Sequence, residues 1–456
     1  FVGGARGQAG ALFVQRPSGR FRQRPQPALD ADREREDIAC AFFDADGDAQ
    51  PELYVASGSS EFAAGSERLA DRLYRIEGGG TLTPIDGALP PRDGGPAPTG
   101  TVRAADVDGD GDLDLFVGDR MTAPADGDAQ GYGIPVGGRI LENDGAGTFA
   151  DATDQVAPQL RASALQAAGI TDAAWGDLDG DGVPDLMVVG EWMRPTVFFN
   201  QGGRLERADP EAVGLGPNRG WWHSVALIDL NGDGALDWVG GNHGLNSRFE
   251  AHPERPAQLW AGDFSQNGQL EHILATYNDG GGPYPVALRQ NLIQYLPTVR
   301  RRYPTFADYA ETTVPEMFSA EQLEAAEHYQ AEQLATVVGW NDGAGRFRVD
   351  SLPFRAQLAP MYGIAAADLD GSGRPALFMG GNLEAVQPQA GPYDASYGVV
   401  LRPDSAGTYR AVPSRVSGFL SPGEVRAIQV LRREGPPLIL VARNDGRLQA
   451  FQGAAP

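Results

Sequence analysis

Short apolar runs recur in pairs along this chain, and an acidic, glycine-rich run separates the two members of each pair. In the clearest example, apolar residues fill most of 102–105 and of 113–117, with Asp106–Asp114 between them. Runs of this length bounded by turn-forming residues are typical of β strands. The pattern therefore predicts a unit of strand, acidic loop and strand.

The unit is repeated, and repeats of this size point to a solenoid or propeller. Seven segments match it or retain part of it. They begin near Ile38, Val102, Asp177, Asp229, Asp263, Asp368 and Val425. The loop at Asp368 lacks the last acid, and the last segment has two strands and no acidic loop.

Most copies are followed by a second hairpin with an Asn/Asp-Gly or Gly-rich turn, such as 141–149 and 340–347. Such turns between apolar strands are a strong hairpin signal. Four strands per repeat predict an all-β fold, a β-propeller of four-stranded blades over residues 1–456. Seven blades are preferred, with the segment at Asp263 as an excursion from the fourth copy; counting it separately gives eight.

Residues 288–334 interrupt the β pattern and predict a helical insertion. Helical periodicity over 288–309 is broken by Pro297 and Pro304, and Ser319 begins a capping-box pattern. The first blade is expected to be incomplete, because Phe1–Gly4 resembles a second strand and its acidic loop has no counterpart. The chain is thus expected to start inside a blade of a longer polypeptide.

The acidic loops place side-chain oxygens at alternate positions 1, 3, 5, 7 and 9, the arrangement that a hard cation such as Ca²⁺ needs. Position 7 usually supplies a backbone carbonyl, so its side chain varies. A solvated acidic turn is the alternative, but near-complete copies favour about four or five Ca²⁺ ions over Mg²⁺, which dehydrates reluctantly. The ligand candidates are Asp44, Asp46, Asp48, Glu52; Asp106, Asp108, Asp110, Asp112, Asp114; Asp177, Asp179, Asp181, Val183, Asp185; Asp229, Asn231, Asp233, Ala235, Asp237; and Asp263, Asn267, Glu271.

The composition of the chain limits the classes of partner that it can bind. The formal charge of −24 leaves no basic field for phosphates, so nucleic-acid binding is excluded. No apolar run is long enough to span a membrane. Cys40, the single cysteine, rules out a disulfide framework and is expected to be a core thiol. Loops of this type suit millimolar calcium outside the cell.

The face opposite the acidic loops carries the unusual polar and aromatic residues, at the expected ends of second strands. They could engage a protein or glycan, or could cap strand ends and plug the central channel. The candidates are Arg120, Glu191, Trp192, Asn242, His243, Asn246, Arg248, Asn382, Tyr393, Asp394, Arg443 and Asn444.

These loops and hairpins resemble the FG-GAP/VCBS repeat family, whose integrin α-subunit members form seven-bladed, calcium-binding propellers. Segments 190–193, 220–222, 241–246 and 393–397 are similar to a bacterial subgroup related to cartilage acidic protein, in which an ASPIC/UnbV module can accompany two propeller regions. The resemblance implies a second propeller region of a secreted or cell-surface bacterial protein. The loops at Asp263 and Asp368 depart from the family's metal pattern.

Three functions remain open at this point. The first is a non-catalytic extracellular binding or assembly module that engages a protein or glycan. The second is a structural subunit of a surface complex or filament, with contacts to its own longer polypeptide or other subunits. The third is a calcium-dependent polysaccharide-active enzyme with Arg120, Glu191, His243 and Tyr393 as its groups, although the chain contains no established catalytic motif.

Overall fold

The computed structural model describes residues 1–16, 19–63, 65–120, 137–161, 169–278, 281–386, 391–433 and 435–452. Within these residues the strands form eight sheets with antiparallel neighbours. The expected all-β class is confirmed. Among the described helices, none is long and apolar enough to cross a membrane.

Most sheets are simple meanders whose strands follow the chain order. The first sheets are β1 (Leu12–Gln15) and β2 (Phe21–Arg24); β3 (Asp37–Phe43), β4 (Glu52–Ser57), β5 (Arg72–Glu77) and β6 (Thr81–Pro84); and β7 (Thr99–Ala105), β8 (Asp114–Asp119), β9 (Gly138–Asn143) and β10 (Phe149–Asp151). Next come β11 (Gly169–Gly176), β12 (Asp185–Met193), β13 (Thr196–Asn200) and β14 (Leu205–Arg207), with β15 (Gly220–Trp221) paired to β12. The last sheets of this kind are β24 (Met361–Ala367), β25 (Ala376–Gly381), β26 (Val399–Pro403) and β27 (Tyr409–Val412); and β28 (Val425–Leu431), β29 (Leu438–Arg443) and β30 (Gln449–Gln452).

One sheet is interrupted by an insertion. It contains β16 (Ser224–Ile228), β17 (Asp237–Gly241), β22 (Val337–Asn341) and β23 (Phe347–Ser351). Between β17 and β22 the chain forms a separate sheet of β18 (Ala257–Gly262), β19 (Glu271–Tyr277), β20 (Pro283–Pro285) and β21 (Glu327–Ala331). The acidic loop at Asp263 joins β18 to β19, so it belongs to this insertion.

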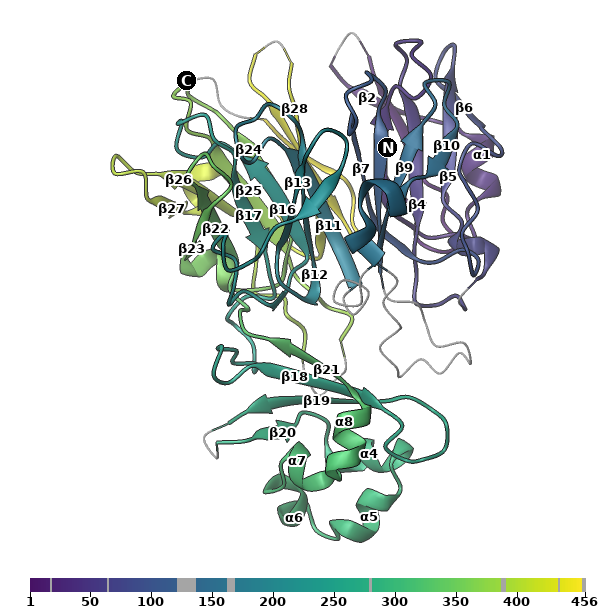
Figure 1. Ribbon diagram of the computed structural model, residues 1–456. Helices are drawn as coiled ribbons and strands as arrows, with labels where there is room; N and C mark the ends of the chain where they lie inside the picture. The colour runs from purple at the N-terminus through teal and green to yellow at the C-terminus, as the bar shows by residue number, and fades with distance from the viewer. Residues whose placement is uncertain are drawn as a thin grey trace.

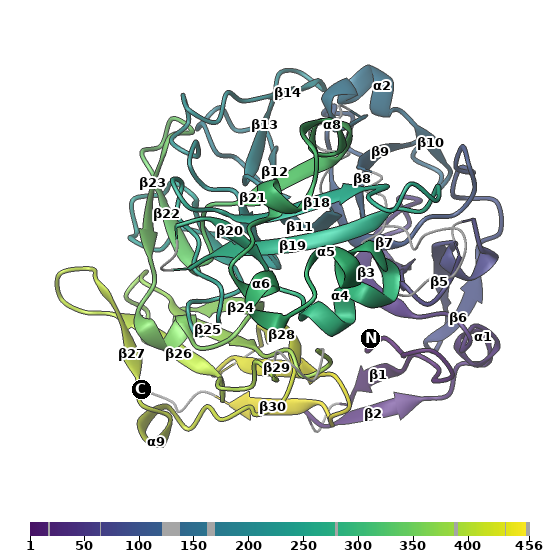
Figure 2. The same ribbon diagram turned by 90° about the horizontal axis from the view of Figure 1, so that it is seen from below.

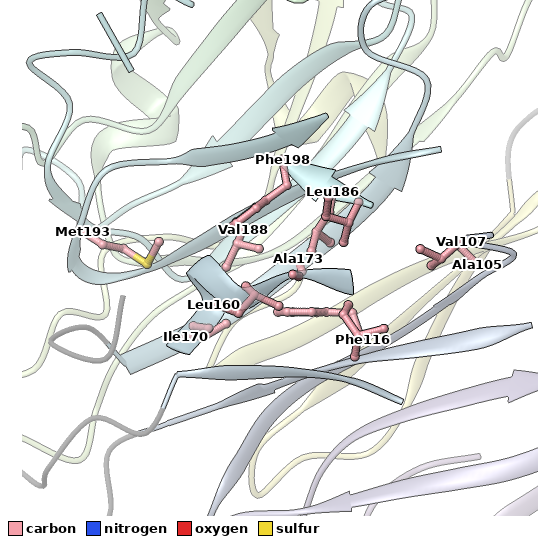
Figure 3. Packing of buried hydrophobic residues seen from close by; sticks show 13 residues of the cluster. Ala105, Val107, Phe116, Leu160, Ile170, Ala173, Leu186, Val188, Met193 and Phe198 are labelled. Atoms are coloured by element: carbon pink, nitrogen blue, oxygen red, sulfur yellow. The ribbon is translucent and has the colours of Figure 1, made fainter. Parts of the chain in front are cut away.

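The meander sheets and the interrupted sheet lie around a common centre, with their first strands innermost (Figure 2). Neighbouring first strands contact one another in the order β3, β7, β11, β16, β24 and β28. Apolar side chains fill the space between adjacent sheets. Figure 3 shows one such layer, in which Phe116 of β8 packs near Ile170 and Ala173 of β11. The fold is therefore β-propeller-like.

The inserted sheet projects from one end of these sheets, called the lower face below (Figure 1). It carries helices α4 (Arg289–Tyr295), α5 (Thr298–Arg302), α6 (Phe306–Ala310), α7 (Val314–Met317) and α8 (Ala320–Ala325), and has its own apolar core. A second apolar cluster joins the insertion to the sheets around the common centre, which together are called the ring. In this cluster Trp192 contacts Trp221 and Tyr329, and Trp221 contacts Phe249. Short helices α1 (Pro27–Ala31), α2 (Thr153–Val156) and α9 (Ser414–Ser417) lie elsewhere.

Two expectations need correction. Helix does not fill 288–334, because Glu327–Ala331 forms β21, which pairs with residues 257–261 of β18. The Trp260 ring stacks on His328 with centroids 4.5 Å apart, and sheet pairing overrides the helical preference of this segment. Cys40 is exposed and is not a core thiol. Residues on either side of it pack toward β7, so Cys40 lies on the other side of β3.

Candidate functional site

Each acidic loop is folded by its first carboxylate. The Asp106 side chain accepts backbone hydrogen bonds from Gly109 at 2.8 Å and from Gly111 at 3.1 Å. The two glycines have φ values of 82° and 99°, the left-handed conformation that glycine adopts without strain. The same pair of bonds recurs at Asp177 and at Asp229. The turn that the sequence indicated is therefore present.

Three loops gather carboxylates closely enough to hold a metal ion. In each group one oxygen from each residue lies within 4.8 Å of the others. The groups are Asp44, Asp46 and Asp48; Asp106, Asp108 and Asp114; and Asp177, Asp179 and Asp185. Closely spaced carboxylates repel one another when ionised, and a bound cation relieves this repulsion. Oxygen-only donor sets of this kind fit a hard cation.

The remaining metal-ligand candidates do not belong to these three clusters. Asp110 and Asp181 cap the next turn by accepting from the backbone N–H groups of Asp112 and Val183. In the fourth loop, the Asn231 amide donates to Asp233 at 2.8 Å. The backbone N–H of Ala235 also donates to Asp233. In the inserted loop, Asp263 accepts from Asn267 and Gly268. Both loops contain fewer carboxylates, and in the inserted loop the first bond to Asp263 comes from the fourth residue after it instead of the third.

The acid at position 9 is buried beneath the loop. Asp114 accepts backbone hydrogen bonds from Val107 at 3.0 Å and Asn143 at 2.9 Å, one at each oxygen. Asp185 and Asp237 repeat this arrangement. Burial raises the pKa of each of the three to about 6. Glu52 and Glu271 accept from the backbone in the same place. This position thus connects the loop to its own sheet.

Sequence reasoning missed an asparagine that connects neighbouring sheets. The Asn200 amide on β13 donates to Val107 O, in the loop of the preceding sheet, at 2.7 Å and to Pro184 O at 3.2 Å. Asn143 and Asn341 bridge the preceding loop in the same way. The signal was visible, because each asparagine lies just before a Gly-containing turn.

The degenerate loop at Asp368 has a substitute for this bridge. Its sheet has Pro403 where three other sheets have asparagine, and Ala376 in place of the buried acid. Here the Tyr409 hydroxyl bonds Leu230 O at 3.2 Å and Pro375 O at 2.8 Å. The link between sheets is therefore kept by a different side chain.

Replacement of Ala49 with glycine should stabilise the protein. Ala49 occupies the position of Gly111 and Gly182 and has a φ of 65°, which is unfavourable for a residue with a Cβ. We expect Ala49→Gly to raise the free energy of unfolding by about 0.5–1 kcal/mol in urea titrations. Ala146→Gly, at an exposed turn residue without this conformation, should give no gain. A loss for Ala49→Gly would contradict the strain argument.

On the lower face, several candidate residues hold the backbone in place. Asn242 is fully buried; its side chain accepts from Trp221 N and donates to Gln333 O. Asn382 bonds the backbone of Ser396 in both directions. Trp192 is buried against the insertion. Arg443 donates to backbone carbonyls, Asn444 to Glu424 and Asn246 to Leu358 O. These contacts fit the strand-capping alternative.

Other candidates form two further groups. Arg120 lies 3.6 Å from Glu191. His243 packs edge-on against Tyr393, with ring centroids 4.8 Å apart, and Arg248 lies over the Phe249 ring beside them. Asp394 is exposed next to Tyr393. Sequence reasoning missed His223, Tyr362 and Arg426, which contact one another on this face.

His243 should make the protein sensitive to mild acid. Burial lowers its pKa to about 4, whereas an unfolded histidine has a pKa near 6.5. The unfolded chain therefore takes up the proton first, and stability falls as pH drops from 6.5 toward 4. We expect the loss of unfolding free energy between pH 7 and 4.5 to be roughly 2–3 kcal/mol smaller in His243→Gln than in wild type. Equal losses in urea titrations would rule this out.

Comparison with known proteins supports the repeat assignment. The model of the FG-GAP-like repeat matches residues 57–117, 126–188 and 177–240. The chain contains FG-GAP-like repeats. These matches cover the acidic loops at Asp106, Asp177 and Asp229. No curated protein gives a significant match.

Solved structures are similar at low identity. A lectin from Agrocybe aegerita, described as recognising non-reducing terminal N-acetylglucosamine, is 14% identical with a TM-score of 0.46, covering 99% of this chain and 89% of the lectin. A rhamnogalacturonan lyase from Bacillus licheniformis is 14% identical with a TM-score of 0.29, covering 92% of this chain and 74% of the lyase. At these TM-scores the likeness does not establish a shared fold or function.

Proposed function

We propose that this chain is a non-catalytic, extracellular, calcium-stabilised binding and assembly module that engages a protein or glycan through its lower face. The observation that carries the proposal is that the two ends of the sheets carry different kinds of residues. Each acidic loop is folded by hydrogen bonds from its own backbone to its first carboxylate, and an asparagine of the next sheet bonds to the loop. Polar and aromatic side chains and the insertion occupy the other end.

Calcium is the proposed cation. The three clusters of carboxylates offer only oxygen donors in flexible, glycine-rich turns. This arrangement suits Ca²⁺ better than Mg²⁺. With the loops at Asp229 and Asp263, the chain would hold four or five ions. Their role is structural, because each loop joins the first two strands of a sheet. A secreted or cell-surface, bacterial location follows from this need for calcium and from the family resemblance.

Seven blades are the proposed organisation. The β18–β21 sheet lies between β17 and β22, which pair with each other, so it is an excursion from one blade. The remaining seven sheets include the two-stranded β1–β2 and the three-stranded β28–β30. The resemblance to the cartilage acidic protein subgroup makes this a second propeller region.

The proposal is tested with arrays of surface glycans and extracellular proteins, probed with the calcium-loaded chain. We expect binding that is lost in a lower-face double variant, Arg248→Gln/Tyr393→Phe, and kept in Arg348→Gln on the outer strand β23. Circular dichroism and melting curves confirm that the variants fold. Equal binding by the lower-face variant, or no binding by the native chain on either array, would overturn the proposal.

A further inference from the structure

Five of the first strands, β3, β7, β11, β24 and β28, have a one-residue bulge near their start. The strand register shifts between Asp37 and Ala39, Thr99 and Thr101, Ile170 and Asp172, Met361 and Gly363, and Val425 and Ala427. The extra residues are Ile38, Gly100, Thr171, Tyr362 and Arg426. Bulges of this kind redirect a side chain out of the regular sheet.

His223 occupies the same place before β16. Its backbone N–H donates to Gly241 O at 2.8 Å, and Gly241 is also the partner of Ser224 in the sheet. Two residues of one strand thus face one residue of the other. The first strands are the innermost strands, so their bulges lie around the centre of the lower face. These bulge positions, which are Ile38, Gly100, Thr171, His223, Tyr362 and Arg426, are called the rim.

Three rim residues from successive sheets form a continuous stack. The His223 ring lies on Tyr362 with centroids 4.5 Å apart and an angle of 29° between the planes. The Arg426 guanidinium carbon lies 4.4 Å from the Tyr362 ring centroid. An imidazole, a phenol and a guanidinium are therefore held in a fixed order by three separate strands.

Arg120 lies on the same face, at the end of β8 in another sheet. A Cβ placed on Gly100 would come within 2.6 Å of Arg120 Cγ, so the arginine fills the space that the glycine bulge leaves. The Arg120 backbone is fixed by a 2.8 Å bond to Pro98 O. Its guanidinium reaches Glu191, 3.6 Å away. The rim cluster thus consists of Arg120, Glu191, His223, Tyr362 and Arg426.

The two arginines of the rim cluster are paired with carboxylates, and both remain partly exposed to solvent. Arg426 pairs with Glu424 at 3.0 Å, and the side chains of Arg120 and Arg426 are 47% and 36% exposed. Burial, then His243, then Arg120 and Arg426 lower the pKa of His223, which stays neutral. Burial raises the pKa of Tyr362. Arg426 lies over the Tyr362 ring, and the charges of both arginines act on the His223 and Tyr362 side chains.

We infer that the rim cluster binds a polyhydroxy carboxylate, the chemistry of a hexuronic acid, free or within a glycan. Guanidinium groups bind carboxylates strongly. Glu191 and the Tyr362 hydroxyl can exchange hydrogen bonds with neighbouring hydroxyl groups of the ligand. Glu191 and Glu424 offset the two arginines, so a monoanion fits better than a phosphate dianion. The inference rests on the proposed function of the lower face and names the chemistry of its ligand.

Calorimetric titration of the calcium-loaded chain with glucuronate and galacturonate tests the inference, with glucose and inorganic phosphate as comparisons. We expect saturable binding of at least one hexuronate, tighter than glucose or phosphate. Arg426→Gln and Arg120→Gln should each weaken it about tenfold or more, and Tyr362→Phe severalfold. Glu191→Gln should strengthen it, because Arg120 loses its competing partner. Arg348→Gln, an exposed arginine on β23, should leave the affinity unchanged. An oligouronate that binds when the monomers do not would identify a glycan as the source.

Several results would overturn the inference. These are no binding of monomeric or oligomeric uronate by folded protein, binding of phosphate as tight as that of uronate, or equal weakening by Arg426→Gln and Arg348→Gln. If uronates fail while an array ligand is still lost in Arg248→Gln/Tyr393→Phe, only the ligand class is wrong. If no array ligand depends on the lower face either, the proposed function fails as well.

Discussion

Removal of divalent cations should lower the melting temperature of this protein by about 10 °C or more. A cation at 100 times its dissociation constant stabilises the folded state by about 2.7 kcal/mol per site. The three clusters of carboxylates could each bind a cation and contribute to this stabilisation together. Without the cation, ionised carboxylates within 4.8 Å of one another repel. Melting curves in calcium and in excess chelator measure the difference.

Two variants make this test specific. Asp177→Asn should reduce the calcium-dependent part of the shift, because it removes one carboxylate of a cluster. Asp154→Asn, which is exposed and pairs with Arg161 away from any acidic loop, should keep the full shift. The same melting curve with and without chelator would show that the acidic loops are ordinary turns.

Asn341→Ala should destabilise the protein by about 2–4 kcal/mol. The Asn341 amide donates to Leu178 O at 2.8 Å and to Leu236 O at 3.1 Å, and its oxygen accepts from Gly343 at 3.0 Å. Truncation leaves buried carbonyls without a donor, and each such group costs roughly 1–3 kcal/mol. Urea titration gives the change in unfolding free energy.

Asn246→Ala provides the matched control. Asn246 is exposed, and its side chain donates one hydrogen bond, to Leu358 O at 3.1 Å. We expect its loss to cost no more than about 0.5 kcal/mol. Tyr409→Phe should resemble Asn341→Ala in kind, because the hydroxyl makes the equivalent link between sheets. Equal small effects for Asn341 and Asn246 would show that the bridge adds little.

The sequence predicted the parts of the fold that local chemistry decides. Alternating aspartates with glycines at positions 4 and 6 require a tight turn, and the turn at Asp106 is formed by its own residues. The same holds for the Asn/Asp-Gly hairpins, such as the one between β22 and β23. These elements depend on neighbours in the sequence, so their pattern is readable without the fold.

Other features depend on partners far along the chain. Residues 327–331 have helix-forming composition, but the free edge of β18 makes them a strand. Asn200 bonds a carbonyl 93 positions earlier, and the sequence cannot show which carbonyl that is. The rim cluster combines residues from five sheets, and the bulge that redirects Tyr362 exists only in the paired strand. The sequence did identify Arg120 and Glu191, because they lie at the ends of recognisable second strands.

The most direct test of the central claim is array binding of the calcium-loaded chain as wild type, as the lower-face variant Arg248→Gln/Tyr393→Phe, and as the outer-strand control Arg348→Gln. We expect wild type and the control to bind the same ligand, and the folded lower-face variant to lose it. Retained binding in the lower-face variant would contradict the claim that acidic loops maintain the fold while the opposite face recognises the partner.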